Sequence, residues 1–470
     1  MHNDTQSPFT LSLLDDDLHF QVVRFSGHEA LNQPYRFEIE VIGLAPALSL
    51  ERLQNQPAYL GLGPGQGVHG VLCSTGLEYR GTFQVAYKLQ LIPRLKTLDQ
   101  HRRRIFQHLS VPMILHRLLE ENELPADSYR FELTTGQYPV RAFCIQYEET
   151  DLDLLQRLCE EEGIHYHFEH QRDGHVLVLA DDSLSFPQDA LLTTFQSDAF
   201  DETKEPMITE LFQRHVSRPS PPRPVPGNRG TANVTDGAAN HSLPPTMPPL
   251  RSPARDQLSR RQLERLRCRQ LQIEGRSHLG ALRSARIVQV SEHPLTSFND
   301  QWLVTEVWHQ GQPISPFAEN TPGVTLEYHN RFTAIPWSTA FRPALKQPRP
   351  NIPGYQPARV CGPIGQPADR DEQGRIRVNI WSSLQTDTDE SAGLWLPVAL
   401  ACAQDPGNLS RLPVAGSDVL VSFLDSDPDR PVLCAVMAPL EPPRPAPNPR
   451  PVGDSRLLLD WLVNRSDFEL

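Results

Sequence analysis

Two stretches near the end of the chain decide the fold: Asp371–Ile380 reads DEQGRIRVNI, and Gly416–Pro431 reads GSDVLVSFLDSDPDRP. Apolar residues occupy every second position of Ile376–Ile380, the pattern of a strand with one buried face. Val419–Phe423 repeats this alternation and leads into a turn rich in Asp and Pro, after which the apolar run Val432–Val436 returns as a partner strand. The pattern predicts a small β-barrel that serves assembly and not catalysis.

These two segments resemble the oligonucleotide/oligosaccharide-fold (OB-fold) spike domain of the VgrG family, the tip proteins of bacterial type VI secretion systems. Four stretches nearer the N-terminus are similar to hub signatures of the same family: Gln33–Val41, Tyr87–Leu95, Arg103–Gln107 and Cys144–Leu152, the last continuing to Ile164. The resemblance extends from residue 9 to about residue 440.

The resemblance implies a mainly β fold with minor α structure. We expect two hub β-barrel-like domains with helical and α/β insertions, followed by an OB-fold spike barrel, in a homotrimer. The expected divisions are a first hub barrel at 1–98, an α/β connecting region at 99–190, a second hub barrel at 191–350 with a Pro-rich insertion at 218–250, the OB-fold spike at 351–438, and a Pro-rich linker with a short tip at 439–470.

The same resemblance implies a structural function. Three copies would form a pseudo-sixfold platform that caps the tube of Hcp protein and meets the baseplate. Sheath contraction would then drive this tip, with a PAAR-type tip protein, effectors or their chaperones, through a target membrane by mechanical puncture. Hubs of phages and related contractile injection particles share these parts, so the type of machine stays open.

The C-terminal end departs from the family pattern. After Met437 the family's long run of short strands, which forms a β-helical needle, is missing up to Leu470. We expect the needle to be truncated or naturally absent. A second hypothesis makes the chain an adaptor, in which the Pro-rich arm and an apolar tip recruit an effector. The tip residues expected to bind this partner are Leu457, Leu458, Trp461 and Leu462.

Composition limits the classes of partner and compartment. The net charge of −13 argues against nucleic acid, because a phosphate-binding surface needs a basic face. The polar N-terminus lacks the basic and apolar regions of a signal peptide, and no apolar run approaches the roughly 18 residues of a membrane span. We therefore expect assembly in the cytoplasm and export through the chain's own apparatus. Seven cysteines without a C-x-x-C pair suggest buried free thiols.

Local signals predict three helices and a hairpin. One helix begins after Thr150, a good N-cap with Asp153 three residues on, and ends at Gly163. A second begins at Ser110, and an arginine-rich third spans roughly Arg255–Glu274. Two strands, 165–170 and 175–180, flank an Asp-Gly turn.

Three clusters suggest chemistry, and each has a plainer explanation. His165, His167 and His170 suggest zinc or nickel chelation, although a solvent-facing row on the hairpin is favoured because no further ligand is evident. The carboxylates of Asp418, Asp425, Asp427 and Asp429 suggest calcium, but turn formation explains them better. The arginines of the third helix, at 255, 260, 261, 265, 267 and 269, suggest nucleic acid, but a solvated or intersubunit face is favoured.

No catalytic constellation emerges. Neither a G-x-S-x-G elbow nor an H-E-x-x-H helix is present, and adjacent carboxylates such as those of Glu120 and Glu121 point in different directions on a helix. We therefore expect no enzymatic activity, no cofactor and no metal, and an enzyme remains a third hypothesis.

Overall fold

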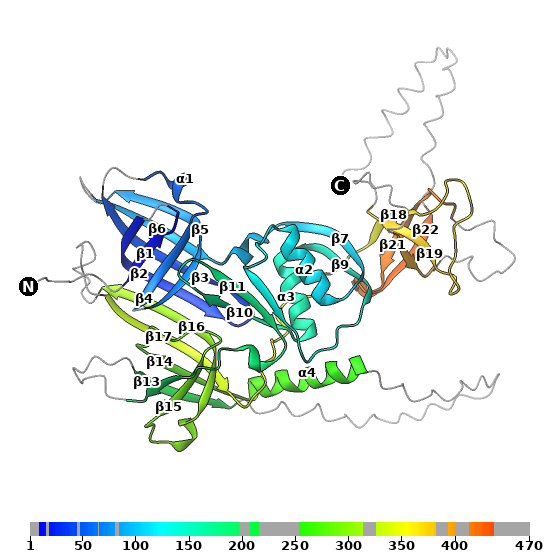
Figure 1. The fold of residues 1–470 in the computed structure, drawn as a ribbon. Coiled ribbons are helices and arrows are strands. Elements are labelled where there is room, and N and C mark those ends of the chain that lie inside the picture. Colours follow the sequence, from blue (N-terminus) through cyan, green and yellow to red (C-terminus); the bar gives the residue numbers. More distant parts are fainter. Residues whose placement is uncertain are drawn as a thin grey trace, which may run out of the picture. The chain divides into compact units, whose positions relative to one another are not determined.

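The chain folds into two compact units, residues 1–351 and 352–470 (Figure 1). The computed structural model describes residues 9–15, 18–44, 48–63, 65–79, 84–196, 207–215, 253–313, 326–381, 393–399 and 413–436. Strands dominate both units, and this confirms the predicted mainly β fold with minor α structure.

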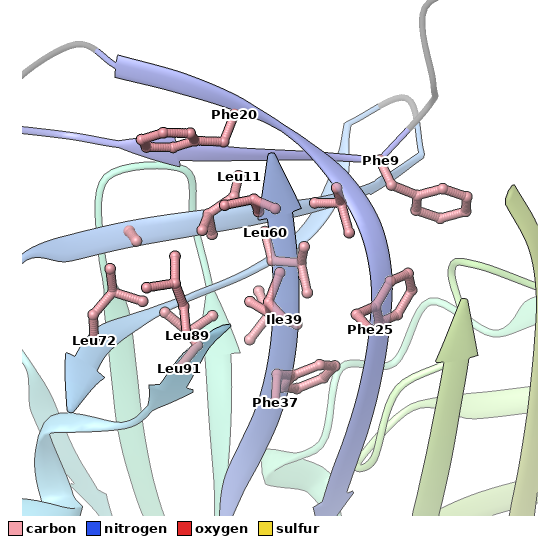
Figure 2. Close-up of a cluster of buried hydrophobic side chains, with 14 of the residues drawn as sticks. Phe9, Leu11, Phe20, Phe25, Phe37, Ile39, Leu60, Leu72, Leu89 and Leu91 are labelled. Atoms are coloured by element: carbon pink, nitrogen blue, oxygen red, sulfur yellow. The ribbon is translucent and has the colours of Figure 1, made fainter. Parts of the chain in front are cut away.

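The first barrel of unit one is a closed ring of strands. The hydrogen-bonded order runs β1-β4-β5-β6-β3-β2, and β1 also pairs with β2, so the sheet returns to its first strand. Its core is filled by the inward aromatic and leucine side chains that Figure 2 shows, among them Phe25, Phe37 and Leu60. The elements are β1 (Thr10–Leu13), β2 (Leu18–Ala30), β3 (Gln33–Leu44), α1 (Leu50–Leu53), β4 (Pro57–Gly63), β5 (Gln66–Tyr79) and β6 (Gln84–Ile92).

The second barrel closes through a single bridge. Its strands follow the order β16-β17-β14-β13, while β16 also pairs with β15 and β15 with β12. Phe195, just after β12, bridges Ile208 of β13 and completes the ring. The strands are β12 (Leu191–Thr194), β13 (Ile208–His215), β14 (Leu271–Ser277), β15 (Ile287–Ser291), β16 (Gln301–Pro313) and β17 (Leu326–Pro336).

The two barrels share one continuous sheet. Strand β2 of the first barrel pairs antiparallel with β16 of the second over Phe25–Ala30 and Glu306–Gly311. The strands β5-β6-β3-β2-β16-β17-β14-β13 therefore form one hydrogen-bonded surface that crosses both barrels.

An α/β region lies between the barrels in sequence. It contains β7 (His101–Leu109), α2 (Val111–Glu121), β8 (Tyr129–Glu132), β9 (Arg141–Thr150), α3 (Asp151–Glu162), β10 (His165–His170) and β11 (His175–Ala180). The Thr150 side chain accepts from the Asp153 amide, and Asp153 accepts from the Thr150 amide in return. Gly163 ends α3 in the left-handed conformation at φ 71°, so both predicted helix boundaries and the hairpin are confirmed.

The second unit is a small five-stranded barrel. The strands β18 (Tyr355–Val360), β19 (Ile376–Ile380), β20 (Leu394–Leu396), β21 (Asp418–Phe423) and β22 (Pro431–Val436) pair in the order β20-β19-β18-β21-β22. The Leu433 amide donates to Pro397 O, and the Ala399 amide donates to Leu433 O, so the chain after β20 closes the ring onto β22. The buried side chains of β19 and β21 sit at every second position, as their sequence predicts.

The arginine-rich helix is shorter than expected. Helix α4 spans Pro253–Gln270 and β14 starts at Leu271, so the predicted helical end at Glu274 is wrong. Residues 271–277 pair with both β13 and β17, and this ladder overrides the helical tendency of the polar sequence.

Single 3₁₀ turns complete the structure at η1 (Arg94–Thr97), η2 (Ser183–Ser185), η3 (Thr296–Phe298) and η7 (Leu424–Ser426). The domain divisions drawn from the sequence stay a prediction.

Glycines opposite phenylalanines let the strands of the shared sheet pack closely. Phe37 lies directly opposite Gly27, and Phe25 opposite Gly311. A Cβ atom on Gly27 would lie 2.1 Å from Cε1 of Phe37, and one on Gly311 would lie 2.2 Å from Cε1 of Phe25. Each ring therefore covers the bare backbone of its cross-strand neighbour, on the buried face of the sheet.

We expect Gly27→Ala to lower the free energy of unfolding of unit one by about 1–3 kcal/mol, the usual cost of overpacking a core. The added methyl group must displace the Phe37 ring, which is fully buried. Gly174→Ala is the matched control, because nothing lies within 4 Å of a Cβ atom there. Thermal unfolding of both variants measures the difference, and equal midpoints would contradict the packing argument.

Candidate functional site

The shared sheet has one exposed, hollowed face. A groove of about 1120 Å³ crosses β2, β16, β17 and β14, and a second hollow of about 540 Å³ continues over β3, β6 and β5. Charged and polar side chains line both hollows, including those of Arg36, Glu38, Lys88, Glu274 and Arg331. The two hollows adjoin, because Ser26, Arg36, Glu38 and Gln310 line both of them.

An aromatic pair covers the join between the barrels on this face. The His28 and Trp308 rings stack with centroids 3.9 Å apart, and they occupy directly opposite positions on β2 and β16. Trp308 nevertheless remains 53% exposed. The Glu306 carboxylate accepts a hydrogen bond from Nε2 of His28 at 2.8 Å, and this bond lowers the pKa of Glu306.

The opposite face of the same join is a buried polar cluster. His309 and Glu29 are both buried, and Nε2 of His309 lies 3.0 Å from Oε1 of Glu29. Burial opposes the charge on Glu29, but Arg283 and the hydrogen bond from His309 outweigh it and lower the pKa of this carboxyl group. The other ring nitrogen of His309 bonds the Tyr328 hydroxyl at 2.7 Å. Because these partners come from β2, β16 and β17, the cluster ties the two barrels together.

The sheet ends in two open strand edges. Beyond Ile208, no strand among the described residues pairs with the outer edge of β13. At the other end, β5 pairs with β6 on one side; on its other side the Thr75 hydroxyl donates to Leu50 O of α1, and no described strand pairs with the part from Gly76 to Tyr79. Phe212 of β13 is 64% exposed and lies on the hollowed face, opposite Glu274. Open edges of this kind are templates for pairing with another chain.

A histidine cluster joins the first barrel to the α/β region. Nδ1 of His69 on β5 lies 2.9 Å from Nδ1 of His175 on β11, and the Arg94 amide donates to Nε2 of His175 at 3.2 Å. The Tyr35 ring meets the His175 ring edge-on with centroids 5.9 Å apart. Burial, helped by Arg94 and only partly opposed by Asp173, lowers the pKa of His69 to about 4. Burial and the neighbouring histidines His170 and His69 lower the pKa of His175 to about 2.

The prediction of a solvent-facing histidine row is wrong. His165 and His167 are 0% and 1% exposed, because Phe186 packs against both rings. Nε2 of His165 bonds the Ser185 hydroxyl at 3.0 Å. Within the described ranges, no three His, Cys, Asp or Glu side chains are grouped in a way that could hold a metal ion.

The arginines of α4 do not form one solvated face. Arg261 is 3% exposed and its Nη1 lies 2.9 Å from Oε2 of Glu162, so the interpretation of the row as solvent-facing is wrong at this position. Arg265 donates to backbone oxygens of Glu160 and Pro343, whereas the side chains of Arg260 and Arg267 are exposed.

Asp425, Asp427 and Asp429 of the small barrel lie in a turn, as predicted, whereas Asp418 begins strand β21 and pairs with Arg359, so the turn interpretation is wrong for that residue. The Asp427 carboxylate accepts from the Asp429 amide at 3.0 Å, and Asp425 pairs with Arg430.

The tip residues expected to bind a partner lie outside the described residues; they are Leu457, Leu458, Trp461 and Leu462. The six described cysteines form no disulfide, as predicted, but Cys73, Cys361 and Cys434 are only half-buried. No described helix has both the length and the apolar character needed to cross a membrane.

Comparison with known families shows which proteins share this architecture. The model of the phage tail baseplate hub (GPD) matches residues 28–313, more than half of the chain. This chain belongs to the phage tail baseplate hub family. The model of the type VI secretion system/phage-baseplate injector OB domain matches residues 361–437, so the predicted OB-fold barrel is confirmed.

Several curated relatives of this hub protein are named type VI secretion system spike proteins, and another is named a toxin. It is 39% identical to the spike protein VgrG4b of Pseudomonas aeruginosa over 91% of its own length and 56% of that protein. VgrG5 of the same organism is 38% identical over 91% of this chain and 57% of its own length. The actin cross-linking toxin VgrG1 of Vibrio cholerae is 29% identical over 88% of this chain and 40% of that protein. The resemblance to the VgrG family is thus confirmed, and the chain spans a little over half of its first two relatives.

A solved structure shows the same fold. The E. coli c3393 protein, described as a type VI secretion component with structural similarity to the T4 bacteriophage tail proteins gp27 and gp5, matches with a TM-score of 0.68 at 24% identity. The match covers 91% of this chain and 99% of that one. The hub protein therefore shares its fold with that protein over nearly all of both chains.

We expect acid to destabilise unit one through the His69–His175 pair. In the unfolded chain both histidines bind a proton near the ordinary pKa of 6.5, whereas in the folded chain they do so only near pH 4 and pH 2. The unfolded state therefore binds more protons below pH 6.5, and stability falls as the pH drops towards 4. Two such histidines lower the free energy of unfolding by about 4 kcal/mol between pH 7 and pH 5.

Urea unfolding at pH 7 and pH 5 measures this loss. The His175→Gln variant should lose less stability between the two pH values, while His116→Gln, at an exposed histidine, should behave like the unchanged protein. Parallel pH dependence in all three proteins would show that the cluster is not responsible.

Proposed function

We propose that this hub protein is the structural tip subunit of a type VI secretion system, and that three copies form the platform that caps the Hcp-like tube and carries effectors outward. The similarity to VgrG4b and VgrG5 over nine-tenths of the chain supports this assignment. We propose no enzymatic activity for these residues, because the relatives that match most of the chain at 38–39% identity are named spike proteins. Assembly in the cytoplasm and export through the apparatus itself belong to the same proposal.

The observation that carries the proposal is the pair of open strand edges on the shared sheet. Within one chain, β2 and β16 already join two barrels edge to edge, with the stacked His28 and Trp308 rings over the join. The same kind of join between copies requires one edge from each barrel, and β13 and β5 provide them. A copy-to-copy ladder of this kind is heterologous, so it closes into a ring when the rotation allows it.

The shapes of the two edges fit each other. Phe212 is an exposed aromatic side chain at the β13 edge of the hollowed face. On the β5 edge, Gly76 lies opposite Lys88 and carries no side chain. We propose that Phe212 of one copy covers this part of β5 in the next, as Trp308 covers His28 within a chain.

The curvature of the sheet sets which face lines the ring. A sheet that is hollowed on one face closes with that face inward, so the polar groove becomes the wall of a central channel. Its charged lining, with Arg36, Glu38, Lys88 and Arg331, suits a surface in contact with water and with the secreted tube.

Phe212→Lys should weaken the trimer at least tenfold in dissociation constant. A lysine on a strand edge disfavours pairing, and removing one buried aromatic side chain from each contact forfeits about 1.5–3 kcal/mol. Sedimentation velocity over a range of concentrations measures the shift from three copies towards the single chain of 53.0 kDa.

Leu192→Lys is the matched control, because Leu192 is a 73% exposed residue of β12, a strand whose end meets β13 only at the Phe195–Ile208 bridge and not along the open part of β13. The control should remain trimeric. If the Phe212→Lys protein stays trimeric at all concentrations, the proposed edge pairing is contradicted. If the unchanged protein is a monomer, the proposed trimer itself is contradicted.

A partner-binding role for Leu457, Leu458, Trp461 and Leu462 stays a prediction. It belongs to the adaptor hypothesis and is compatible with the platform, because the platform surfaces lie in unit one.

A further inference from the structure

Helix α4 packs inward through charged side chains and one buried cysteine, Cys268. The face that contacts the rest of unit one carries Arg261, which pairs with Glu162, and Glu264, which accepts from Nε of Arg342 at 2.7 Å. Arg265 on the same face donates to Pro343 O at 2.9 Å. The helix is therefore held by ion pairs and hydrogen bonds to α3 and to residues after β17.

The outward side of α4 carries three leucines. Leu258, Leu263 and Leu266 are 51%, 54% and 51% exposed. At 3.6 residues per turn, the three positions fall within an arc of about 140° around the helix axis. We call these three residues the leucine arc. A helix on the surface of a monomeric protein turns its apolar side towards the core of that protein. Helix α4 has the reverse orientation, which indicates that another surface covers the leucine arc.

The leucine arc is next to the open β13 edge in the chain. Figure 1 shows α4 leading into β14, which lies beside β13. Gln270 ends α4, and Leu271 begins β14, where it pairs with His215 at the end of β13. A copy that adds its β5 edge to β13 therefore arrives beside the helix. The open part of β13, Thr209–His215, is too short to supply alone the roughly 800 Å² per partner that stable interfaces bury.

Charge favours a second copy as the partner. The exposed side chains of Arg260, Arg267 and Arg269 surround the arc, against one exposed carboxylate, that of Asp256. The whole chain has a net charge of −13, so a neighbouring copy is an acidic partner for this basic rim.

We infer that the leucine arc of α4 is a contact surface for the neighbouring copy, and that it extends the edge-to-edge join outside the shared sheet. This inference rests on the proposed trimer. The ion pairs on the inward face of α4 hold the helix to its own subunit. They do not explain the exposed leucines on the outward face, whereas a contact with the neighbouring copy does.

Replacing Leu263 and Leu266 together by Glu tests the inference. Glutamate favours helices, so the exposed positions should remain helical while the apolar contact is lost and charge is added. We expect the trimer dissociation constant to rise at least tenfold in sedimentation velocity, with an unchanged circular dichroism spectrum. The matched control replaces Leu184 and Leu345, 72% and 60% exposed residues outside α4, by Glu, and should leave the trimer unchanged.

The outcomes separate this inference from the proposed function. If the unchanged protein and the Leu263/Leu266 variant are equally stable trimers, the arc does not contact a neighbouring copy and the trimer proposal stands. Loss of binding to the tube protein in such a variant would assign the arc to that partner and also overturn the inference. If the unchanged protein is a monomer, the trimer and the inference fail together. Hydrogen exchange of α4 gives a second readout: protection that does not increase with protein concentration overturns the inference even where the variant misfolds.

Discussion

The antiparallel ladder between β2 and β16 is the constraint on which unit one depends. Each barrel closes on itself, yet β2 and β16 both keep one edge for the other barrel. This is possible because both strands are long, 13 residues each, so that different parts of β2 pair with β1 and with β16. A shorter strand could pair with only one of these neighbours, so it could close its own barrel or join the other barrel, but not both.

The two faces of that ladder differ in packing and in polarity. On the buried face, Gly27 and Gly311 receive the rings of Phe37 and Phe25, and the Glu29–His309 pair places a charge where solvent does not reach. On the hollowed face, the stacked His28 and Trp308 rings cover the join while charged residues keep the surface polar. Leaving the buried Glu29 carboxylate without its partners would be strongly destabilising, so this cluster fixes the join in register as well as in place. A fixed join within the chain gives each copy the same angle between its barrels, which closing a ring requires.

Sequence patterns predicted the elements in which local and tertiary preferences agree. The strands β19 and β21 and the capped helix α3 follow directly from alternation and from the Thr150–Asp153 capping box. The family resemblance added the number and order of the barrels. The errors arose where a distant partner decides: residues after Gln270 join a strand ladder, and His165 and His167 are enclosed by Phe186. The open β13 edge was missed because nothing in the sequence of residues 208–215 shows that the outer side has no described strand; the exposure of Phe212 becomes evident only in the structure.

The most direct test of the central claim is an electron cryomicroscopy map of the purified chain at a resolution that separates strands. We expect three copies around one axis, with β13 of each copy hydrogen-bonded to β5 of the next and the hollowed face of the shared sheet turned inward. A ring joined through other elements, or a single copy with both strand edges in solvent, would contradict the account.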